Sequence, residues 1–272
     1  MTAGQGRSCG PTTLAGSLAA GPQAGPIPQK GEHTAMSTRT TDHQLTVDEK
    51  GPGALIAAEG VVLVLAFGLL VAPVPEWTAR EMTVLEWISA HHSAVGDLIA
   101  TLVSQVFSPI GAPIVLLGLG AAIAARRGMR RSLVLVIVTA VTWLSSWGVK
   151  MLVHRARPDG GLLVTKPPVE TSFAYPTGHT VFATVIVIAA AIALGPRHRA
   201  WSTPAAIALV LATAASRVYL GVHYPSDVIA GVVFGASTFT LLYAVARTPP
   251  GRHLLTHRPP AEPEGTPPAR HA

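Results

Sequence analysis

Six apolar runs fill the middle of this 272-residue chain, and each is long enough to cross the hydrocarbon core of a bilayer as a helix. Such a helix needs about 20 mostly apolar residues. Only 12% of the residues are charged, against about 25% in an average soluble domain. The sequence therefore predicts an all-α protein, a polytopic membrane bundle of six transmembrane helices. The six runs cover residues 54–74, 107–125, 133–152, 177–195, 203–220 and 227–246.

The segments around these runs have a different composition. Residues 1–53 and 247–272 are rich in Gly, Pro and polar residues and show no helical or strand period, which is typical of disordered tails. We therefore expect a six-span domain over residues 54–246, flanked by two disordered tails. Met36 is a second possible start of the chain, so the length of the first tail depends on the start site. The stretch 76–105 contains Trp77 and Trp87 and is expected to include an interfacial helix.

The basic residues indicate the orientation, because Lys and Arg accumulate in the short loops on the cytoplasmic side. They place both termini in the cytoplasm and the segments 75–106, 153–178 and 217–226 on the outer face of the cell membrane. The net charge of +6 then reflects topology and requires no nucleic-acid partner. A single cysteine excludes an intrachain disulfide framework. The loop residues used are Arg126, Arg127, Arg130, Arg131, Arg197, Arg199, Arg247, Arg252 and Arg258.

Three polar clusters interrupt the outward ends of the apolar runs. In the first cluster, Lys150 and Arg157 lie seven residues apart, which is about two helical turns, so both project from one face at the end of the third run. A single basic side chain in such a place commonly extends to lipid head groups. His154 and Arg155 lie between the two and are expected at most to extend a cationic rim.

The second cluster is Tyr175-Pro176-Thr177-Gly178-His179, directly before the fourth run. Pro, a hydroxyl residue and Gly at this place are typical of a helix amino terminus, where unpaired backbone N–H groups form a binding site for anions. Taken alone, the same residues are also compatible with an ordinary turn and helix cap.

The third cluster joins the fifth and sixth runs and contains Ser216, Arg217, His223 and Asp227. Asp227 follows His223 by four residues and can accept a hydrogen bond from its imidazole, which fixes the tautomer of the ring. The alternative is that Asp227 caps a helix and that Arg217 binds a lipid phosphate.

The coincidence of all three clusters on one side of the membrane favours a functional site. Together they supply three cations, a helix amino terminus, two histidines and a carboxylate. Cations and backbone N–H groups are what a phosphoryl group needs as its charge develops. A histidine held by a carboxylate can act as a nucleophile, and a second histidine can protonate a leaving oxygen.

With these residues the chain resembles the type 2 phosphatidic acid phosphatase superfamily, which also includes bacterial acid phosphatases and vanadium haloperoxidases. The resemblance covers about residues 54–246. Where the family more usually has Ser, this chain has Thr177, which keeps the hydroxyl and adds a methyl group. The three-part family signature is matched by Lys150 with Arg157-Pro158, by Pro176-Thr177-Gly178-His179, and by Ser216-Arg217 with His223 and Asp227.

The resemblance implies a role for each matching residue. His223 would attack phosphorus to form a phosphohistidine, Asp227 would orient His223, and His179 would protonate the leaving group. The resemblance implies no cofactor and no metal ion. The substrate phosphate would be bound by Lys150, Arg157, Thr177, Gly178, Ser216 and Arg217.

The membrane setting then favours a phosphorylated lipid as substrate, either a phosphate monoester or a pyrophosphate. Phosphatidic acid, phosphatidylglycerol phosphate and polyprenyl pyrophosphates all fit this description. Three alternatives use the same pocket: a lipid phosphotransferase, a haloperoxidase that holds vanadate, and a phospholipid binding or transport protein without turnover. Six apolar runs disfavour the haloperoxidase, and the presence of both His179 and His223 disfavours the binding protein.

Overall fold

The computed structural model describes residues 51–248, and within this range it consists of helices and their connections, without β-strands. The all-α prediction is confirmed. The two expected tails lie outside the described residues, except at their inner ends, because α2 already begins at Gly51. The helices are α2 (Gly51–Val71), α3 (Pro75–Ala90), α4 (Ala94–Val106), α5 (Gly111–Arg127), α6 (Met129–Val153), α7 (Gly178–Leu194), α8 (Arg199–Tyr219) and α9 (Pro225–Ala246), with the short 3₁₀ turns η1 (Gly160–Leu162) and η2 (Pro196–His198).

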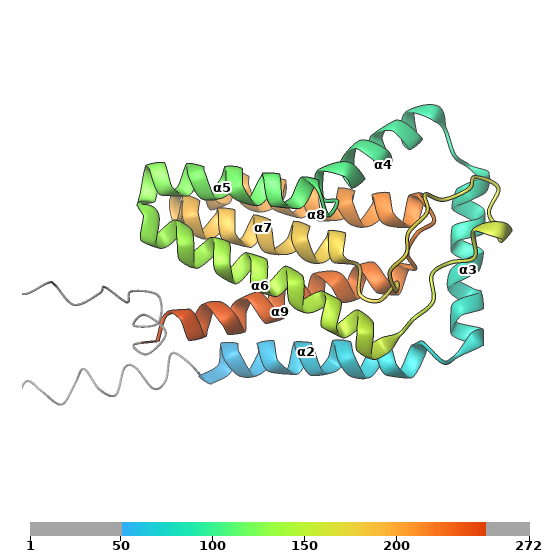
Figure 1. Ribbon diagram of the computed structural model, residues 1–272, viewed down its shortest axis with the longest axis horizontal. Coiled ribbons are helices and arrows are strands. Elements are labelled where there is room, and N and C mark those ends of the chain that lie inside the picture. Colours follow the sequence, from blue (N-terminus) through green and yellow to red (C-terminus); the bar gives the residue numbers. More distant parts are fainter. Residues whose placement is uncertain (1–50, 249–272) are drawn as a thin grey trace, which may run out of the picture. The chain divides into compact units, whose positions relative to one another are not determined.

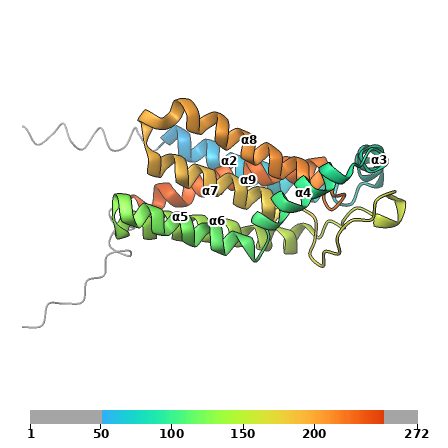
Figure 2. The ribbon, with the colours of Figure 1, turned by 90° about the horizontal axis from the view of Figure 1, so that it is seen from above.

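Helices α2 and α5 to α9 run side by side as a bundle (Figures 1 and 2). Helix α9 lies inside this bundle, where it contacts α2, α6, α7 and α8. The main apolar core includes Leu135 of α6, Phe182 of α7 and Phe239 of α9, each almost completely buried. Around the outside of the bundle, large apolar side chains such as Leu63 and Leu144 are about two-thirds exposed, at 66% and 64%. In a membrane these exposed apolar side chains contact the lipid tails, which explains why they are not buried within the protein.

Not every predicted membrane span is a single straight helix of sufficient length. By length and hydropathy, α2 from Gly53, α6 and α9 can each cross a membrane. The pairs α4–α5 and α7–α8 also qualify when each pair is counted together, but they bend by 61° and 112°. Helices α5 and α7 have 17 residues each, slightly short of a full crossing. By this criterion residues 51–248 of an integral membrane protein contain three to five spans, and the count of six stays a prediction.

Two glycines of α2 allow it to approach the rest of the bundle closely. A Cβ on Gly60 would lie 2.2 Å from the Ser237 hydroxyl of α9, and one on Gly68 would lie 2.4 Å from the Tyr175 ring. Small residues at such crossings are how membrane helices pack without a strong hydrophobic driving force. The Tyr175 hydroxyl also donates a hydrogen bond to the Val64 carbonyl at 2.7 Å, which ties the segment before α7 to α2.

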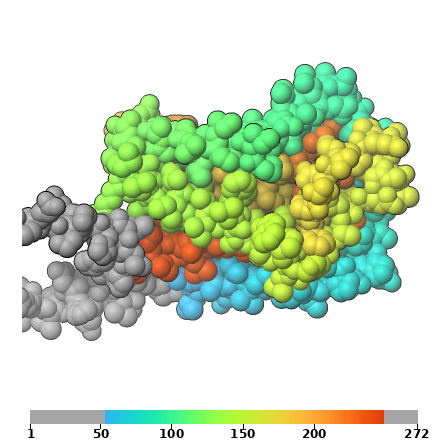
Figure 3. Space-filling view, in the orientation of Figure 1, coloured from blue at the N-terminus to red at the C-terminus, as the bar shows by residue number. Residues whose placement is uncertain are grey.

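One end of the bundle is covered by additional structure. Helix α3 lies across this end, and α4 extends from the side of the bundle beside it (Figure 1). The long α6–α7 connection, residues 154–177, occupies the same end and is drawn in yellow-green and yellow in Figure 3. The expected interfacial stretch 76–105 thus forms two helices, α3 and most of α4.

Candidate active site

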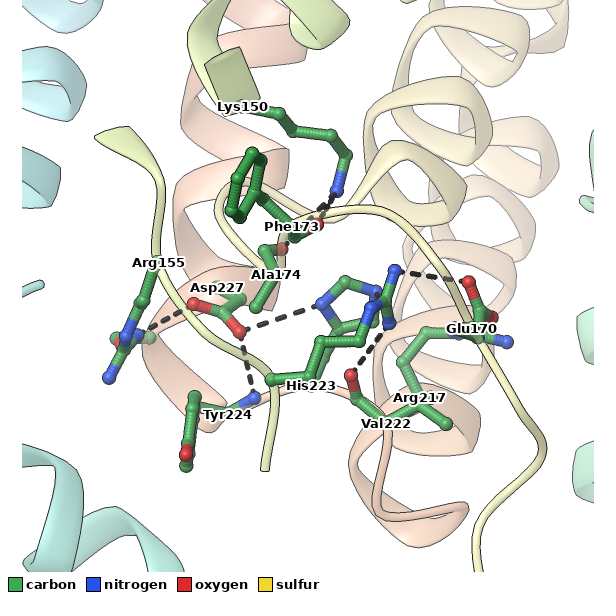
Figure 4. A network of polar contacts seen from close by, with 12 residues as sticks. Lys150, Arg155, Glu170, Phe173, Ala174, Arg217, Val222, His223, Tyr224 and Asp227 are labelled. Carbon is green, nitrogen blue, oxygen red and sulfur yellow. Dashed lines mark hydrogen bonds and ion pairs between the residues drawn. The ribbon is translucent and has the colours of Figure 1, made fainter. Parts of the chain in front are cut away.

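Residues of the first and third polar clusters lie close together in the structure (Figure 4). Lys150 comes from the last turn of α6, Arg217 from the last turn of α8, and His223 from the α8–α9 connection. Asp227 lies in the first turn of α9. All four side chains are buried, although each is polar or charged. Buried charges persist only with partners, so their surroundings define what this site can do.

Asp227 is held in place by its own helix and lies next to His223. The backbone N–H of Tyr224 donates to Asp227 Oδ2 at 2.9 Å, so the carboxylate reaches back over the first turn of α9. The same oxygen lies 3.5 Å from His223 Nδ1. Both side chains are almost completely buried, at 1% and 0% exposure. The carboxylate can therefore orient the imidazole and favour a proton on Nδ1.

The other nitrogen of His223 faces the cations. His223 Nε2 lies 3.2 Å from Arg157 Nη1. Burial, followed by the charges of Arg157, Lys150 and Arg217, holds the pKa of His223 well below its usual value. His179, the second residue of α7, also contributes to this lowering of the pKa. A neutral ring with its proton on Nδ1 leaves a lone pair on Nε2, directed toward the cationic pocket.

Lys150 and Arg157 are fixed by backbone carbonyl groups. Lys150 Nζ donates to the Phe173 carbonyl at 2.5 Å and to the Ala174 carbonyl at 3.5 Å. Arg157 donates to the Ser172 carbonyl at 2.6 Å and to the Val222 carbonyl at 2.8 Å. These contacts hold both side chains in fixed positions. Less conformational entropy is therefore lost when a ligand binds to them.

Glu170, in the α6–α7 connection, bridges two of the three cations. Its carboxylate pairs with Arg157 at 3.0 Å and forms a closer pair with Arg217. A cavity of about 360 Å³ opens beside Arg157 and Glu170. Carboxylate and phosphate oxygens accept the same forked hydrogen bonds from guanidinium groups. Glu170 therefore occupies a place that suits an anion with several oxygens, and no motif in the sequence singles it out.

The amino terminus of α7 supplies further donors. Gly178 is the first residue of α7, so its N–H has no acceptor within the helix. The Thr177 hydroxyl is buried and has no hydrogen-bond partner among the described residues. The Thr177 N–H, in contrast, donates to the Asp227 carbonyl at 3.2 Å. This N–H joins α7 to α9, and the expected phosphate contact from the Thr177 amide stays a prediction.

Comparisons with known proteins show what this chain is similar to. Residues 131–249 match the family model described as the PAP2 superfamily. Over this stretch the chain is similar to that family. The fold agrees: the crystal structure of a transmembrane PAP2 type phosphatidylglycerolphosphate phosphatase from Bacillus subtilis matches with a TM-score of 0.60 and 20% identity, over 69% of this chain and 94% of that one.

Several curated relatives match about a third of the chain. Decaprenylphosphoryl-5-phosphoribose phosphatase of Mycobacterium tuberculosis is 37% identical over 97 residues, 36% of this chain and 51% of that protein. Lipid A 1-phosphatase of Rhizobium johnstonii is 42% identical over 103 residues, 35% of this chain and 39% of that protein. Phosphatidylglycerophosphatase B of Escherichia coli is 39% identical over 95 residues, 34% of this chain and 35% of that protein. The chain spans about half the length of these relatives or less.

Within the PAP2 stretch, Ser216 lies in α8. Its hydroxyl donates to the Thr213 carbonyl one turn earlier in α8, at 2.7 Å. A serine inside a helix commonly forms this local bond. The hydroxyl proton of Ser216 is bound within α8, and donation from this hydroxyl to phosphate stays a prediction.

Arg155 differs from its expected place on a cationic rim. Its side chain is 2% exposed and lies on the side of Asp227 that faces away from His223. It donates to Asp227 Oδ1 at 2.6 Å, to the Ser226 hydroxyl at 2.7 Å and to Glu81 Oε2 at 2.5 Å. Sequence analysis missed this role because Glu81 lies outside the PAP2 stretch, on α3, and 74 residues from Arg155.

The acidic and histidine side chains of the site are not arranged as a metal centre. Among residues 51–248, no group of three or more His, Cys, Asp or Glu side chains is placed to hold a metal ion. The electrophilic groups of this pocket are instead the two guanidinium groups and the ammonium group described above. Positive side chains of this kind can stabilise the charge of a transferring phosphoryl group.

Proposed function

We propose that this chain is a phosphatase that hydrolyses the phosphate group of a membrane lipid through a phosphohistidine at His223. The observation that carries the proposal is the setting of His223. Its ring is buried, Nδ1 lies beside the Asp227 carboxylate, and Nε2 lies beside the Arg157 guanidinium. One nitrogen is thus placed for orientation and the other for attack on a phosphorus atom bound by the cations.

In the first step, Nε2 of His223 forms a bond to phosphorus as the bond between phosphorus and the leaving oxygen breaks. His179 gives a proton to that oxygen, so the lipid leaves as an alcohol or, from a pyrophosphate, as the shorter phosphate. The imidazole becomes positively charged in this step. The nearby Asp227 carboxylate stabilises that charge and keeps the ring in line with the phosphorus atom.

In the second step, a water molecule attacks the phosphorus atom of the phosphohistidine. His179, which lost its proton in the first step, takes a proton from this water. The bond between phosphorus and Nε2 breaks, and the electron pair returns to His223. Inorganic phosphate leaves, and both histidines are restored to their starting protonation states.

The equatorial phosphoryl oxygens would be bound by Lys150, Arg157 and Arg217, with the Gly178 N–H and the Thr177 hydroxyl as further donors. The Thr177 hydroxyl supports this assignment, since it is buried without a partner. Phosphate has to replace the Glu170 carboxylate between the two arginines. Because the three cations supply the charge that a metal ion provides in other phosphoryl transfer enzymes, we expect activity in the presence of a chelator.

The substrate class follows from the membrane setting. A lipid can keep its tails in the bilayer while its phosphate enters the covered end of the bundle. The names of the three curated relatives all refer to phosphates carried by lipids, which supports this class without selecting one member. The basic loops at the opposite ends of the helices, including Arg126 and Arg127, support a site on the outer face of the membrane and cytoplasmic termini.

The proposal is tested with the full-length protein purified in detergent and EDTA. Release of inorganic phosphate is measured from phosphatidic acid, phosphatidylglycerol phosphate and a polyprenyl pyrophosphate. We expect wild-type protein to release phosphate from at least one of them, and His223→Ala to lower the rate by on the order of 10⁴-fold or more. His198→Ala is the matched control, because His198 lies in η2 at the other end of α7. A His223→Ala protein with the wild-type rate would exclude the phosphohistidine mechanism.

A further inference from the structure

Arg155 forms the centre of a closed polar cluster behind the catalytic pair. Its guanidinium contacts Asp227, Ser226 and Glu81, and it lies over the Tyr224 ring at 4.3 Å from the ring centre. Burial opposes the charge of Arg155, but the carboxylates of Asp227 and Glu81 outweigh it and raise the pKa above its usual value. Arg155 is therefore a permanent cation that faces the rear of Asp227.

Glu81 completes this cluster from α3. One carboxylate oxygen accepts the backbone N–H of Ser226 at 2.7 Å, and the other accepts the Ser226 hydroxyl at 2.9 Å and the Arg155 guanidinium at 2.5 Å. A carboxylate at the first turn of a helix also interacts favourably with the helix dipole. Glu81 thus fixes both the guanidinium and the first turn of α9, from which Asp227 projects.

The two oxygens of Asp227 have different partners as a result. Oδ1 is bound by Arg155, and Oδ2 is bound by the Tyr224 N–H and faces His223 Nδ1. The position of Oδ2 relative to His223 therefore depends on the group that holds Oδ1. Errors of about 1 Å in such an arrangement can cost about 100-fold in rate.

From these contacts we infer that Arg155 and Glu81 are positioning residues for the phosphatase reaction, which hold Asp227 so that it can orient His223. This inference rests on the proposed function, because it concerns the same reaction. Neither side chain touches the pocket that receives phosphate. Their removal should therefore slow formation of the phosphohistidine without weakening the binding of phosphate.

The experiment compares full-length wild-type protein with Arg155→Met, Arg155→Lys and Glu81→Gln. For each protein, kcat and KM are measured with the best lipid substrate, and inorganic phosphate is used as a competitive inhibitor to obtain Ki. The matched control is Glu86→Gln, which makes the same chemical change on the same helix at an exposed position. Thermal unfolding in detergent is recorded for every variant.

We expect Arg155→Met to lower kcat by about 100-fold, with Ki for phosphate unchanged. Arg155→Lys should recover part of the rate, because an ammonium group can still bind Asp227 Oδ1. Glu81→Gln keeps the shape and loses the charge, so we expect a smaller decrease of about tenfold. Glu86→Gln should behave as wild type. Single-turnover measurements should locate the loss in the step that forms the phosphoenzyme.

Several results would overturn the inference. Wild-type kcat in Arg155→Met, or a Ki that rises in step with the loss of rate, would show that Arg155 does not act through Asp227. A loss in Arg155→Met that Arg155→Lys does not relieve at all would indicate a purely structural role. If Arg155→Met does not fold, the isosteric Glu81→Gln decides by the same criteria. A wild-type protein without activity on any lipid phosphate would instead overturn the proposed function, and the positioning role with it.

Discussion

Arg155 and Arg157 are two residues apart in the chain, yet they lie on opposite sides of the His223–Asp227 pair. Arg157 is 14% exposed and binds backbone carbonyls and the Glu170 carboxylate. Arg155 is 2% exposed and binds Asp227, together with Ser226 and Glu81. A cavity opens beside Arg157, which gives a phosphate room to approach its guanidinium. In the proposed reaction the same type of side chain therefore binds the substrate phosphate on one side of the pair and supports the Asp227 carboxylate on the other.

The largest difference between the two sides should appear when each arginine is replaced by methionine. We expect Arg157→Met to lower kcat/KM by about 10²- to 10³-fold and to raise Ki for inorganic phosphate, because a charged donor to the phosphoryl group is lost. Arg155→Met should leave Ki unchanged. Inhibition of lipid phosphate hydrolysis by inorganic phosphate measures both values. Equal effects of the two substitutions on Ki would remove the distinction between the two sides.

The second prediction concerns the protonation of His223. Burial and the nearby cations lower its pKa, so the ring stays neutral as the pH falls through the usual histidine value of about 6.5 and gains its proton only further down. NMR of histidine-labelled protein should show one ring signal, absent from His223→Ala, that does not change near pH 6.5. In Arg157→Met the midpoint should move upward, because one of the lowering charges is gone. A wild-type midpoint at the usual value would contradict the described surroundings of His223.

The third prediction is a substitution that strengthens the binding of phosphate, whereas Arg157→Met in the first prediction weakens it. Glu170→Gln removes the carboxylate charge that competes with phosphate for Arg157 and Arg217. The Glu170 side chain is 25% exposed, so the pair is screened and we expect Ki for phosphate to fall by only about two- to fivefold. The control is Glu86→Gln, whose Ki should equal that of wild type. An increase in Ki would mean that Glu170 assists phosphate binding instead of competing with it.

The smallest expected effect comes from a residue that belongs to neither side of the pair. Tyr175→Phe removes the hydrogen bond from the Tyr175 hydroxyl to the Val64 carbonyl. We expect a loss of about 1 kcal/mol in the free energy of unfolding, since this is a neutral hydrogen bond in a buried place. Thermal unfolding in detergent measures the change. A collapse of phosphate binding in this variant, with unchanged stability, would assign Tyr175 to the pocket instead.

The fold and much of the pocket could be predicted because both depend on local patterns. Apolar runs indicated the helices, and the short spacing between His223 and Asp227 brought them together. The prediction that Lys150 and Arg157 share one helix face is wrong, because α6 ends at Val153 and Arg157 lies in the α6–α7 connection. The number of spans could not be settled in the same way. Bends at the α4–α5 and α7–α8 junctions depend on packing, and no apolar run encodes them.

The groups that the sequence did not reveal are those defined by distant partners. Arg155 looked like one more basic residue beside Arg157, and its burial becomes intelligible only with Glu81 in place. Glu170 lies in a connection without helical or strand periodicity, so its position between two arginines could not be inferred. Ser216 matched the expected motif, but its hydroxyl is used within α8, and a motif does not report which local hydrogen bonds a side chain already makes.

The position of Glu81 also has a consequence for how the protein is made. Glu81 and Ser226 are 145 residues apart, yet both bind the same guanidinium. Arg155 directly follows α6 in the chain, so it is synthesised well before α9, which carries Asp227. Until the ribosome has delivered α9 and this helix has inserted, Arg155 and Glu81 have no Asp227 carboxylate to hold, and the proposed nucleophile His223 is not oriented. A nascent chain should thus hold no hydrolytic activity against the lipids around it, and activity appears only when membrane insertion of the whole bundle is complete.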